Sequence, residues 1–544
     1  MRALPANAEF GYLKKRAKEL IRGYRAGDAD ALARFAAALP AASGRAPDAI
    51  AALGLRLHDA QSCLAREYGF ASWADLKTHV EWQSTGATDL ETRARRWLGL
   101  VYAGDVTGSV EVARPALAAR MLDAEPALAS FSPSHACAVG DEAGLRRTIA
   151  DVPGWIDRPG GPFDLPPLVA VTHSSLLRLP VWRDRLVRCA EILLAAGASP
   201  RSAIGNRYRP ASLAAPDAAH PLSALYGAAG ATRDPGLTQL LLEAGADPND
   251  GEALYHSLEN AACTRLLLEH GARIGGTNAI YRALDLPDPA PIELLLAHGG
   301  DPNEPARNKP ISDWNSPLLW AIRRRQSVHA IAALLGAGAD PRAATPDGVS
   351  AYRMAKQFGL TTVAELLRER GGADALSPEE EFVAACTALD VARARAIAAG
   401  RPDLPAALAP AQLRLMPDLV AEGADAPARL MVELGWPIAT PGGDWHASAL
   451  NLAVFRGDAA MTRFLLEHGA SWREAHAYDS NVAGTLGWAS CTMPVEGGDW
   501  PGCARALLAH GMPRGEPDAE PDVVRVEGVR MRFSEEVADV LIAG

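Results

Sequence analysis

The hydrophobic positions of this chain return in one pattern: two leucines, two variable residues and a glycine, followed by Ala or Gly and often by Asp-Pro. The closest copies cover residues 193–200, 241–248, 267–274, 295–302 and 465–472, and looser copies cover 334–341, 366–373, 431–438 and 507–514. A pattern that returns about every 33 residues is typical of repeat proteins, in which each unit buries its apolar face only against its neighbours. We therefore expect an all-α solenoid of helix-turn-helix units, with an extended binding surface rather than one catalytic pocket.

The N-terminal part of the chain follows a helical pattern without the leucine repeat. The spacing of its apolar residues predicts three helices, near 13–24, 28–39 and 58–68. Ser72, with Asp75 three residues later, has the sequence of an N-cap and predicts the start of a fourth helix. We expect these helices to cap the stack, because an end repeat would otherwise expose its apolar face.

These patterns divide the chain into four parts. We expect a helical leader at 1–88, a first repeat stack at 89–375, a second stack at 376–515 and a C-terminal cap at 516–544. The boundary between the stacks is predicted in the stretch 371–381, which is rich in Gly, Pro and acidic residues.

Three longer segments interrupt the repeats, and the chain ends differently from them. We expect irregular inserts on the loop face at 201–219, 304–315 and 476–500. The last segment reads as a hairpin that turns at Glu527-Gly528, followed by a helix with Ser534 as its N-cap.

Composition narrows the classes of function. The net charge of −11 argues against nucleic-acid binding, which needs a basic face. No apolar run approaches the roughly 20 residues of a membrane helix, and the N-terminus lacks the apolar region of a secretory signal. Seven cysteines without a Cys-x-x-Cys pair suit a reducing compartment. We expect a cytoplasmic monomer that binds neither nucleic acid nor membrane.

A second pattern accompanies the leucine repeat. Its most complete copy, Ser448 to Ala453 (SALNLA), resembles the Thr-Pro-Leu-His-x-Ala opening of ankyrin repeats, and a further copy begins at Ser316 (SPLLWA). The Asp-Pro-Asn at 247–249 and at 301–303 is similar to the family's lead into its β-turn finger. In such a unit the serine caps the first helix, Leu and Ala fill the core between repeats, and Gly reverses the chain.

The chain resembles the bacterial ankyrin-repeat family, closely over about 220–375 and 446–474 and partially elsewhere, and its leader is similar to the helical leader of bacterial members. The resemblance implies an ankyrin-repeat solenoid of about ten to twelve units with β-turn fingers. It also implies a non-enzymatic scaffold that binds a partner protein on its concave surface. The identity of that partner does not follow from the resemblance.

Cysteine and histidine fall at repeated positions, which favours a structural role for both. Three cysteines each stand eight residues before a hinge glycine, and four histidines each stand directly before one: Cys189, Cys263 and Cys503, and His270, His298, His468 and His510. Side chains that recur once per repeat do not gather around one metal ion. A zinc site of His446, His468 and His476 is an unfavoured alternative, because they lack the i, i+4 spacing on one helix.

No established catalytic motif occurs in the sequence. It contains no Gly-x-Ser-x-Gly, no P-loop and no His-Glu-x-x-His. The acidic run at 379–381 is expected to form the first turn of a helix, where it complements the helix dipole, rather than a catalytic carboxylate pair. We therefore expect no catalytic residue, no cofactor and no metal.

The residues expected to contact a partner are those at the exposed end of each first helix, because this is where such scaffolds bind. Counting along the repeat gives Arg323, Arg324, Gln357, Phe358, Phe455, Arg456 and Asp285. Aromatic residues and arginine are common anchors of protein interfaces. The alternative for Phe358 and Phe455 is that they pack against the next repeat.

Two other classes of function remain open. Trp472, Trp488 and Trp500 in the region 472–513 could line a small-molecule or catalytic site, although they could equally fill a terminal core. Such a site could also lie in the N-terminal helices. A third possibility is a secreted bacterial effector that acts on host proteins.

Overall fold

The computed structural model describes residues 4–5, 8–84, 89–109, 113–208, 210–306, 316–443, 445–493, 498–518 and 523–543. The chain divides into two compact units, Met1–Asp301 (unit 1) and Pro302–Gly544 (unit 2). Helices dominate both units and the strands are few and short, so the prediction of an all-α protein is confirmed. Among the described residues, no helix has both the length and the apolarity that crossing a membrane requires.

The predicted N-terminal helices are present in unit 1. The segment contains α1 (Phe10–Arg25), α2 (Ala29–Ala38), α3 (Pro47–Ala51), α4 (Leu57–Glu67) and α5 (Trp73–Ser84). The hydroxyl of Ser72 accepts a hydrogen bond from the Asp75 N–H at 3.1 Å, as its N-cap sequence predicts. The short α3 was not predicted.

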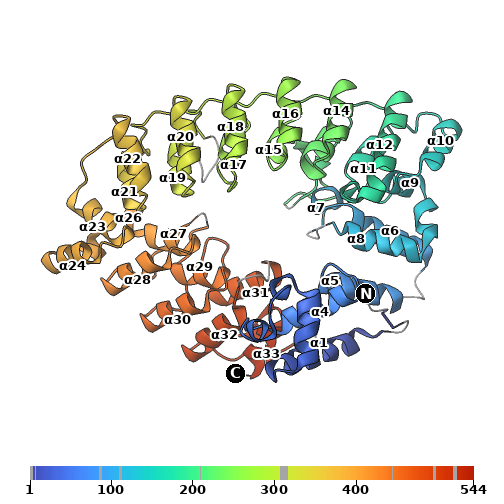
Figure 1. The fold of residues 1–544 in the computed structure, drawn as a ribbon. Coiled ribbons are helices and arrows are strands. Elements are labelled where there is room, and N and C mark those ends of the chain that lie inside the picture. The colour runs from blue at the N-terminus through green and yellow to red at the C-terminus, as the bar shows by residue number, and fades with distance from the viewer. Residues whose placement is uncertain are drawn as a thin grey trace. The chain divides into compact units, whose positions relative to one another are not determined.

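The rest of unit 1 consists of short helices in two layers (Figure 1). They are α6 (Leu90–Val101), α7 (Gly104–Thr107), α8 (Pro115–Ala124), α9 (Pro133–Val139), α10 (Glu142–Asp151), α11 (Pro167–Thr172), α12 (Pro180–Ala195), α13 (Ala224–Tyr226), α14 (Pro235–Glu243), α15 (Ala253–Ser257), α16 (Ala261–Glu269), α17 (Ala279–Ala283) and α18 (Ala290–Ala297). In one layer, α9, α11, α13, α15 and α17 each pack against the next. In the other, α10, α12, α14, α16 and α18 do the same.

Unit 2 continues with helix pairs and ends in a small sheet and a helix. Its helices are α19 (Pro317–Arg323), α20 (Val328–Gly336), α21 (Ala351–Gln357), α22 (Thr361–Glu369), α23 (Pro378–Thr387), α24 (Val391–Gly400), α25 (Leu404–Ala407), α26 (Pro410–Leu413), α27 (Leu415–Ala421), α28 (Asp425–Glu433), α29 (Ala449–Phe455), α30 (Ala459–Glu467), α31 (Val482–Thr492), α32 (Trp500–Ala509) and α33 (Glu535–Ala543). Here α19 packs on α21, α21 on α23, α27 on α29 and α29 on α31.

The leucine pattern marks the end of the second helix of a pair. Gly271 and Gly469 follow α16 and α30 with φ of 90° and 98°, in the left-handed region where a side chain is strained. The leucines before each glycine are buried between neighbouring helices. The repeated phrase therefore encodes both a buried contact and a chain reversal.

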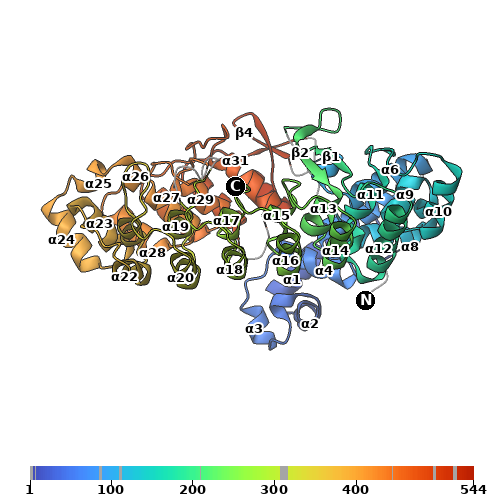
Figure 2. The ribbon, with the colours of Figure 1, turned by 90° about the horizontal axis from the view of Figure 1, so that it is seen from above.

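Two of the three predicted irregular inserts are ordered, so that expectation was wrong for them. The segment 201–219 takes part in an antiparallel pair, β1 (Ala203–Asn206) with β2 (Asp217–Ser223), and β2 leads directly into α13 (Figure 2). The segment 476–500 contains the whole of α31. Of the insert at 304–315, residues 307–315 lie outside the described residues.

The C-terminal hairpin and helix are confirmed. β4 (Val523–Val526) pairs with β5 (Val529–Arg532) around Glu527 and Gly528, and β3 (Glu516–Pro517) adds a third strand beside β4. The Val537 N–H donates to the Ser534 hydroxyl at 3.4 Å at the start of α33.

Candidate functional site

Unit 2 contains a cavity of about 590 Å³ whose wall comes from several helix pairs. It is lined by the ends of α19 and α21, the start of α23, the short helix α26, the first turn of α27, and the loops near 345–349 and 443–446. The cavity therefore collects residues that lie more than a hundred positions apart in the sequence.

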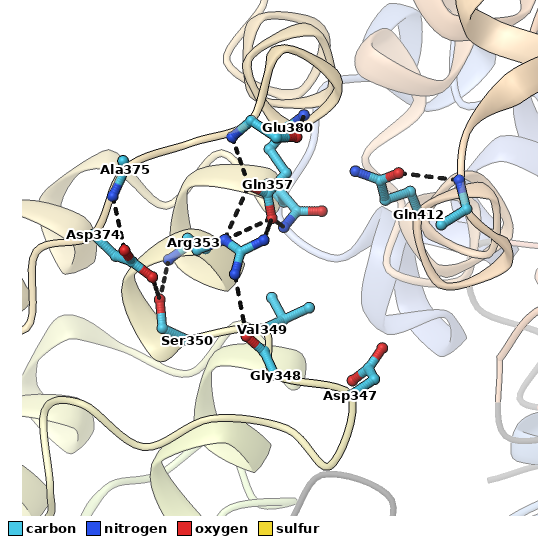
Figure 3. Close-up of polar contacts among 12 residues, drawn as sticks. Asp347, Gly348, Val349, Ser350, Arg353, Gln357, Asp374, Ala375, Glu380 and Gln412 are labelled. Atoms are coloured by element: carbon cyan, nitrogen blue, oxygen red, sulfur yellow. Dashed lines mark hydrogen bonds and ion pairs between the residues drawn. The ribbon is translucent and has the colours of Figure 1, made fainter.

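One side of the cavity is built around the ion pair of Arg353 and Glu380 (Figure 3). Arg353 Nε lies 2.8 Å and 2.9 Å from the two carboxylate oxygens, and Arg353 Nη1 donates to the Gly348 carbonyl at 3.1 Å. Glu380 is only 3% exposed and also accepts the Ser377 N–H at 2.9 Å. The hydrogen bond with Glu380 raises the pKa of Arg353, so the guanidinium stays charged.

The acidic run 379–381 forms the first turn of α23, as predicted. Ser377 caps this helix by accepting the Glu380 N–H at 3.2 Å. Sequence reasoning missed that Glu380 also binds Arg353, because the two residues are 27 positions apart and no local pattern links them.

A second ion pair, between Arg323 and Asp418, lies in another part of the cavity wall. Arg323 Nη2 lies 3.1 Å from Asp418 Oδ1, which also accepts the Gly443 N–H at 2.9 Å. Arg323 was expected to be exposed at the end of its helix, and this expectation was wrong, because it is 4% exposed. The guanidinium can be buried since Asp418 neutralises its charge.

Gln357 and Phe358 also end their helix as predicted, but they too are buried, with 7% and 8% exposure. Gln357 Nε2 donates to Glu380 Oε1 at 3.1 Å. The Phe358 carbonyl accepts from Arg325 Nη1 at 2.8 Å. The expected exposure was therefore wrong for both, yet both side chains line the cavity together with Arg323.

Gln412 approaches the cavity from α26. Its Oε1 accepts the Ala409 N–H at 3.1 Å, and its Nε2 has no hydrogen-bond partner among the described residues. Gln357 Oε1 likewise has none among them. Figure 3 shows the two amides directed toward each other. The cavity thus offers one unused acceptor and one unused donor.

The rim of the cavity carries charges on two sides. Arg414 and His446 are exposed, and neither forms an ion pair with another described residue. Asp347 lies on the loop that carries Gly348 and accepts the Thr345 hydroxyl at 2.5 Å. The rim is therefore basic beside α26 and α27 and acidic at this loop.

The other predicted contact residues do not line this cavity. Arg324 lies over the Trp320 ring at 4.4 Å, and Arg456 donates to the Val420 carbonyl at 2.9 Å. Asp285 follows α17 in unit 1 and is half-buried. All three are at the helix ends that the repeat predicts, but in other surroundings.

Phe455 stacks on Trp488, with ring centroids 5.5 Å apart and planes 9° apart. Trp488 is 53% exposed, whereas Trp472 and Trp500 are buried. The Trp472 indole donates to the Gly511 carbonyl at 3.1 Å. The three tryptophans therefore do not surround one site: two belong to the core and one covers a half-buried phenylalanine.

The repeated cysteines and histidines are part of the scaffold. Cys189, Cys263 and Cys503 are fully buried on second helices. The four histidines before the hinge glycines each donate Nδ1–H to the carbonyl four residues earlier, at 2.8–2.9 Å: His270, His298, His468 and His510. Within the described ranges, no three His, Cys, Asp or Glu side chains are placed to hold a metal ion.

The cavity is suited to binding by hydrogen bonds. Its two buried carboxylates, Glu380 and Asp418, are each engaged by a guanidinium. Beside them, the amides of Gln357 and Gln412 each keep one polar group without a partner among the described residues.

No protein-family model and no curated protein matches this sequence. The resemblance to ankyrin repeats therefore rests on the residues of the chain itself.

Proposed function

We propose that the protein is a non-enzymatic scaffold that binds a segment of a partner protein in the cavity of unit 2. The observation that carries the proposal is the composition of the cavity wall. Its buried charges are paired in salt bridges, and the polar groups left free beside them, on Gln357 and Gln412, are hydrogen-bonding amides, while the charged side chains of Arg414 and Asp347 lie on the rim together with His446.

The local structure of the repeats supports an ankyrin-type stack as the framework. Ser316 and Ser448 accept the N–H groups of Leu319 and Asn451, each at 3.3 Å, which is the capping role that the family motif implies. A stack of this kind presents one helix end per repeat, so a single cavity can collect contacts from several units. The partner would meet a surface that is already formed, which lowers the ordering cost of binding.

The cysteines support the compartment that we propose, the cytoplasm. All seven are free, and six of them are buried. Free thiols are the usual state in a reducing compartment.

Photo-crosslinking tests the proposed function. A photoreactive amino acid at position 411, where an exposed alanine of α26 lines the cavity, should trap a partner protein, and the crosslinked peptide should map to one segment of it. The same amino acid at position 463 is the control, because Arg463 is exposed on α30, makes no ion pair with a described residue and does not line the cavity.

A small molecule is the alternative occupant, since ligand pockets commonly have volumes of about 300–1,000 Å³. No trapped protein at position 411 above the control, together with thermal stabilisation by a metabolite, would overturn the scaffold proposal in favour of ligand binding.

A further inference from the structure

We infer that the cavity recognises a backbone amide of an extended, acidic peptide segment. Gln357 accepts the N–H of that amide, Gln412 donates to its C=O, and Arg414 pairs with a nearby carboxylate of the segment. This inference rests on the proposed function and names the chemistry of the partner.

The orientation of the Gln357 amide is fixed by its neighbour. Its Nε2 donates to Glu380 Oε1, and a carboxylate that also binds Arg353 can only accept hydrogen bonds. A flipped amide would place two acceptor oxygens against each other. Oε1 is therefore the group left for a ligand, on a side chain that is more than nine-tenths buried.

The orientation of the Gln412 amide is also fixed, but here the engaged group is the oxygen. The Ala409 N–H can only donate, so the oxygen of Gln412 must face it. The NH₂ group is then left for a ligand. Because each amide is held by a partner of one kind only, the donor and the acceptor cannot exchange places.

A group that satisfies both side chains must carry a donor and an acceptor close together. A peptide unit does so with its N–H and C=O. A carboxylate could engage only Gln412, and an ammonium group only Gln357. A ligand of the wrong kind would cover Gln357 Oε1 without pairing it, which weakens binding by about 10–100-fold.

The charged residues of the rim determine which charge the bound segment should carry and where on the cavity that charge should lie. Arg323 and Arg353 are already neutralised, whereas Arg414 forms no ion pair with another described residue, so Arg414 is the guanidinium that we assign to the partner. Asp347, on the loop beside Gly348, would repel a second carboxylate there. The acidic residue of the segment should therefore lie next to α26 and α27.

The first test uses Gln412→Glu, because glutamate keeps the oxygen that accepts the Ala409 N–H and replaces the donor by an acceptor. Acidic residues are also favoured in the first turn of a helix, so folding should be unaffected. Gln83→Glu is the matched control: it makes the same charge change at an exposed position of α5, in unit 1.

The probe is a display library of random peptides, panned against the full chain. We expect enriched peptides that carry Asp or Glu, with about 10–100-fold lower affinity for Gln412→Glu and unchanged affinity for Gln83→Glu. N-methylation of one backbone amide of such a peptide should reduce its affinity by a similar factor, and Arg414→Gln should remove the preference for acidic residues.

The inference fails if Gln412→Glu binds the enriched peptides as tightly as Gln83→Glu does, or if no single N-methyl group weakens them. The proposed function fails separately, if crosslinking at position 411 traps no protein. A partner that is trapped there but binds Gln412→Glu normally would leave the scaffold in place and overturn only the amide recognition.

Discussion

The polar cluster of unit 1, formed by Asp105, His173, Arg207 and Tyr226, and the cavity of unit 2 both contain side-chain atoms without a hydrogen-bond partner among the described residues. Those of unit 1 are buried, whereas those of unit 2 line a cavity. In unit 1 the Tyr226 hydroxyl donates to Asp105 Oδ2 at 2.9 Å, and the His173 ring lies 5.7 Å from the Tyr226 ring. Asp105 Oδ1, His173 Nε2 and Arg207 Nε are buried without a partner. In unit 2, Gln357 and Gln412 direct their free groups toward each other.

The difference shows that the effect of a polar group without a hydrogen-bond partner depends on whether a ligand can reach it. An enclosed group lowers stability and shifts proton affinity, because it is desolvated and cannot reach a ligand. Burial lowers the pKa of His173 and raises that of Tyr226. A group beside a cavity can instead be satisfied by a partner, so it contributes to recognition.

The largest expected effect is that of removing the ion pair between Arg323 and Asp418 in the cavity wall. Arg323→Leu removes the guanidinium that neutralises Asp418, so this buried carboxylate loses the charged partner that offsets its desolvation. We expect a loss of about 3–5 kcal/mol in the stability of unit 2, measured by hydrogen exchange of its amides during a denaturant series. Arg463→Leu, at an exposed position, should change stability by less than about 0.5 kcal/mol. Equal effects of the two substitutions would show that this ion pair does not stabilise unit 2.

A smaller effect is expected in the cluster of unit 1. Tyr226→Phe removes the donor to Asp105 Oδ2, so unit 1 should lose about 1–3 kcal/mol, while peptide binding by unit 2 should not change. Protein stability and peptide affinity measured on the same variant test this separation. Weakened peptide binding would mean that the two regions are not independent.

Acidification should lower the stability of unit 1 more than that of unit 2, because of the protonation of buried histidines. In unit 1, burial lowers the pKa values of His79, His135 and His173. In the unfolded chain these histidines bind protons below about pH 6.5, whereas in the folded chain they bind protons only at a lower pH. The stability of unit 1 should therefore fall as the pH drops below about 6.5. In unit 2, burial raises the pKa of Glu474, so the folded state binds a proton more readily and this group acts in the opposite direction. Burial also lowers the pKa of the half-buried His476 in unit 2, which partly offsets the effect of Glu474.

Hydrogen exchange at pH 7.5 and pH 5.5, corrected for the intrinsic rates, measures this difference. We expect the amides of unit 1 to lose more protection than those of unit 2. Equal losses in both units would contradict the assignment of the buried histidines.

The smallest expected effect is that of salt on peptide binding. The contact between Arg414 and an acidic peptide is exposed, so raising the salt from roughly 0.05 to 0.5 M should weaken binding a few-fold. Arg414→Gln should bind more weakly at low salt and respond little to the change. An equal salt response of both proteins would show that another basic residue holds the carboxylate.

Local features of the fold could be predicted from the sequence. Ser72, the hinge glycines and the turn at Glu527-Gly528 each mark a helix end or turn through the chemistry of one or two residues. The β1–β2 pair was missed because its strands carry little alternation of polar and apolar residues, and its register shifts between Gly205 and Asn206. The helix α31 was missed because it lies in a segment without the leucine pattern.

The candidate site could be predicted only in part. The repeat placed Arg323, Gln357 and Phe358 at helix ends, and all three line the cavity. Their burial could not be predicted, because it depends on partners that follow much later in the chain. Asp418 lies 95 positions after Arg323, and no pattern within a repeat refers to it.

The central claim is that the partner occupies the cavity of unit 2. Hydrogen exchange of the full chain, with and without the crosslinked partner segment as a synthetic peptide, tests it most directly. The claim predicts that binding protects residues 345–358 and 409–418, which line the cavity. Protection confined to unit 1, or to the surface around Phe455 and Trp488, would contradict it.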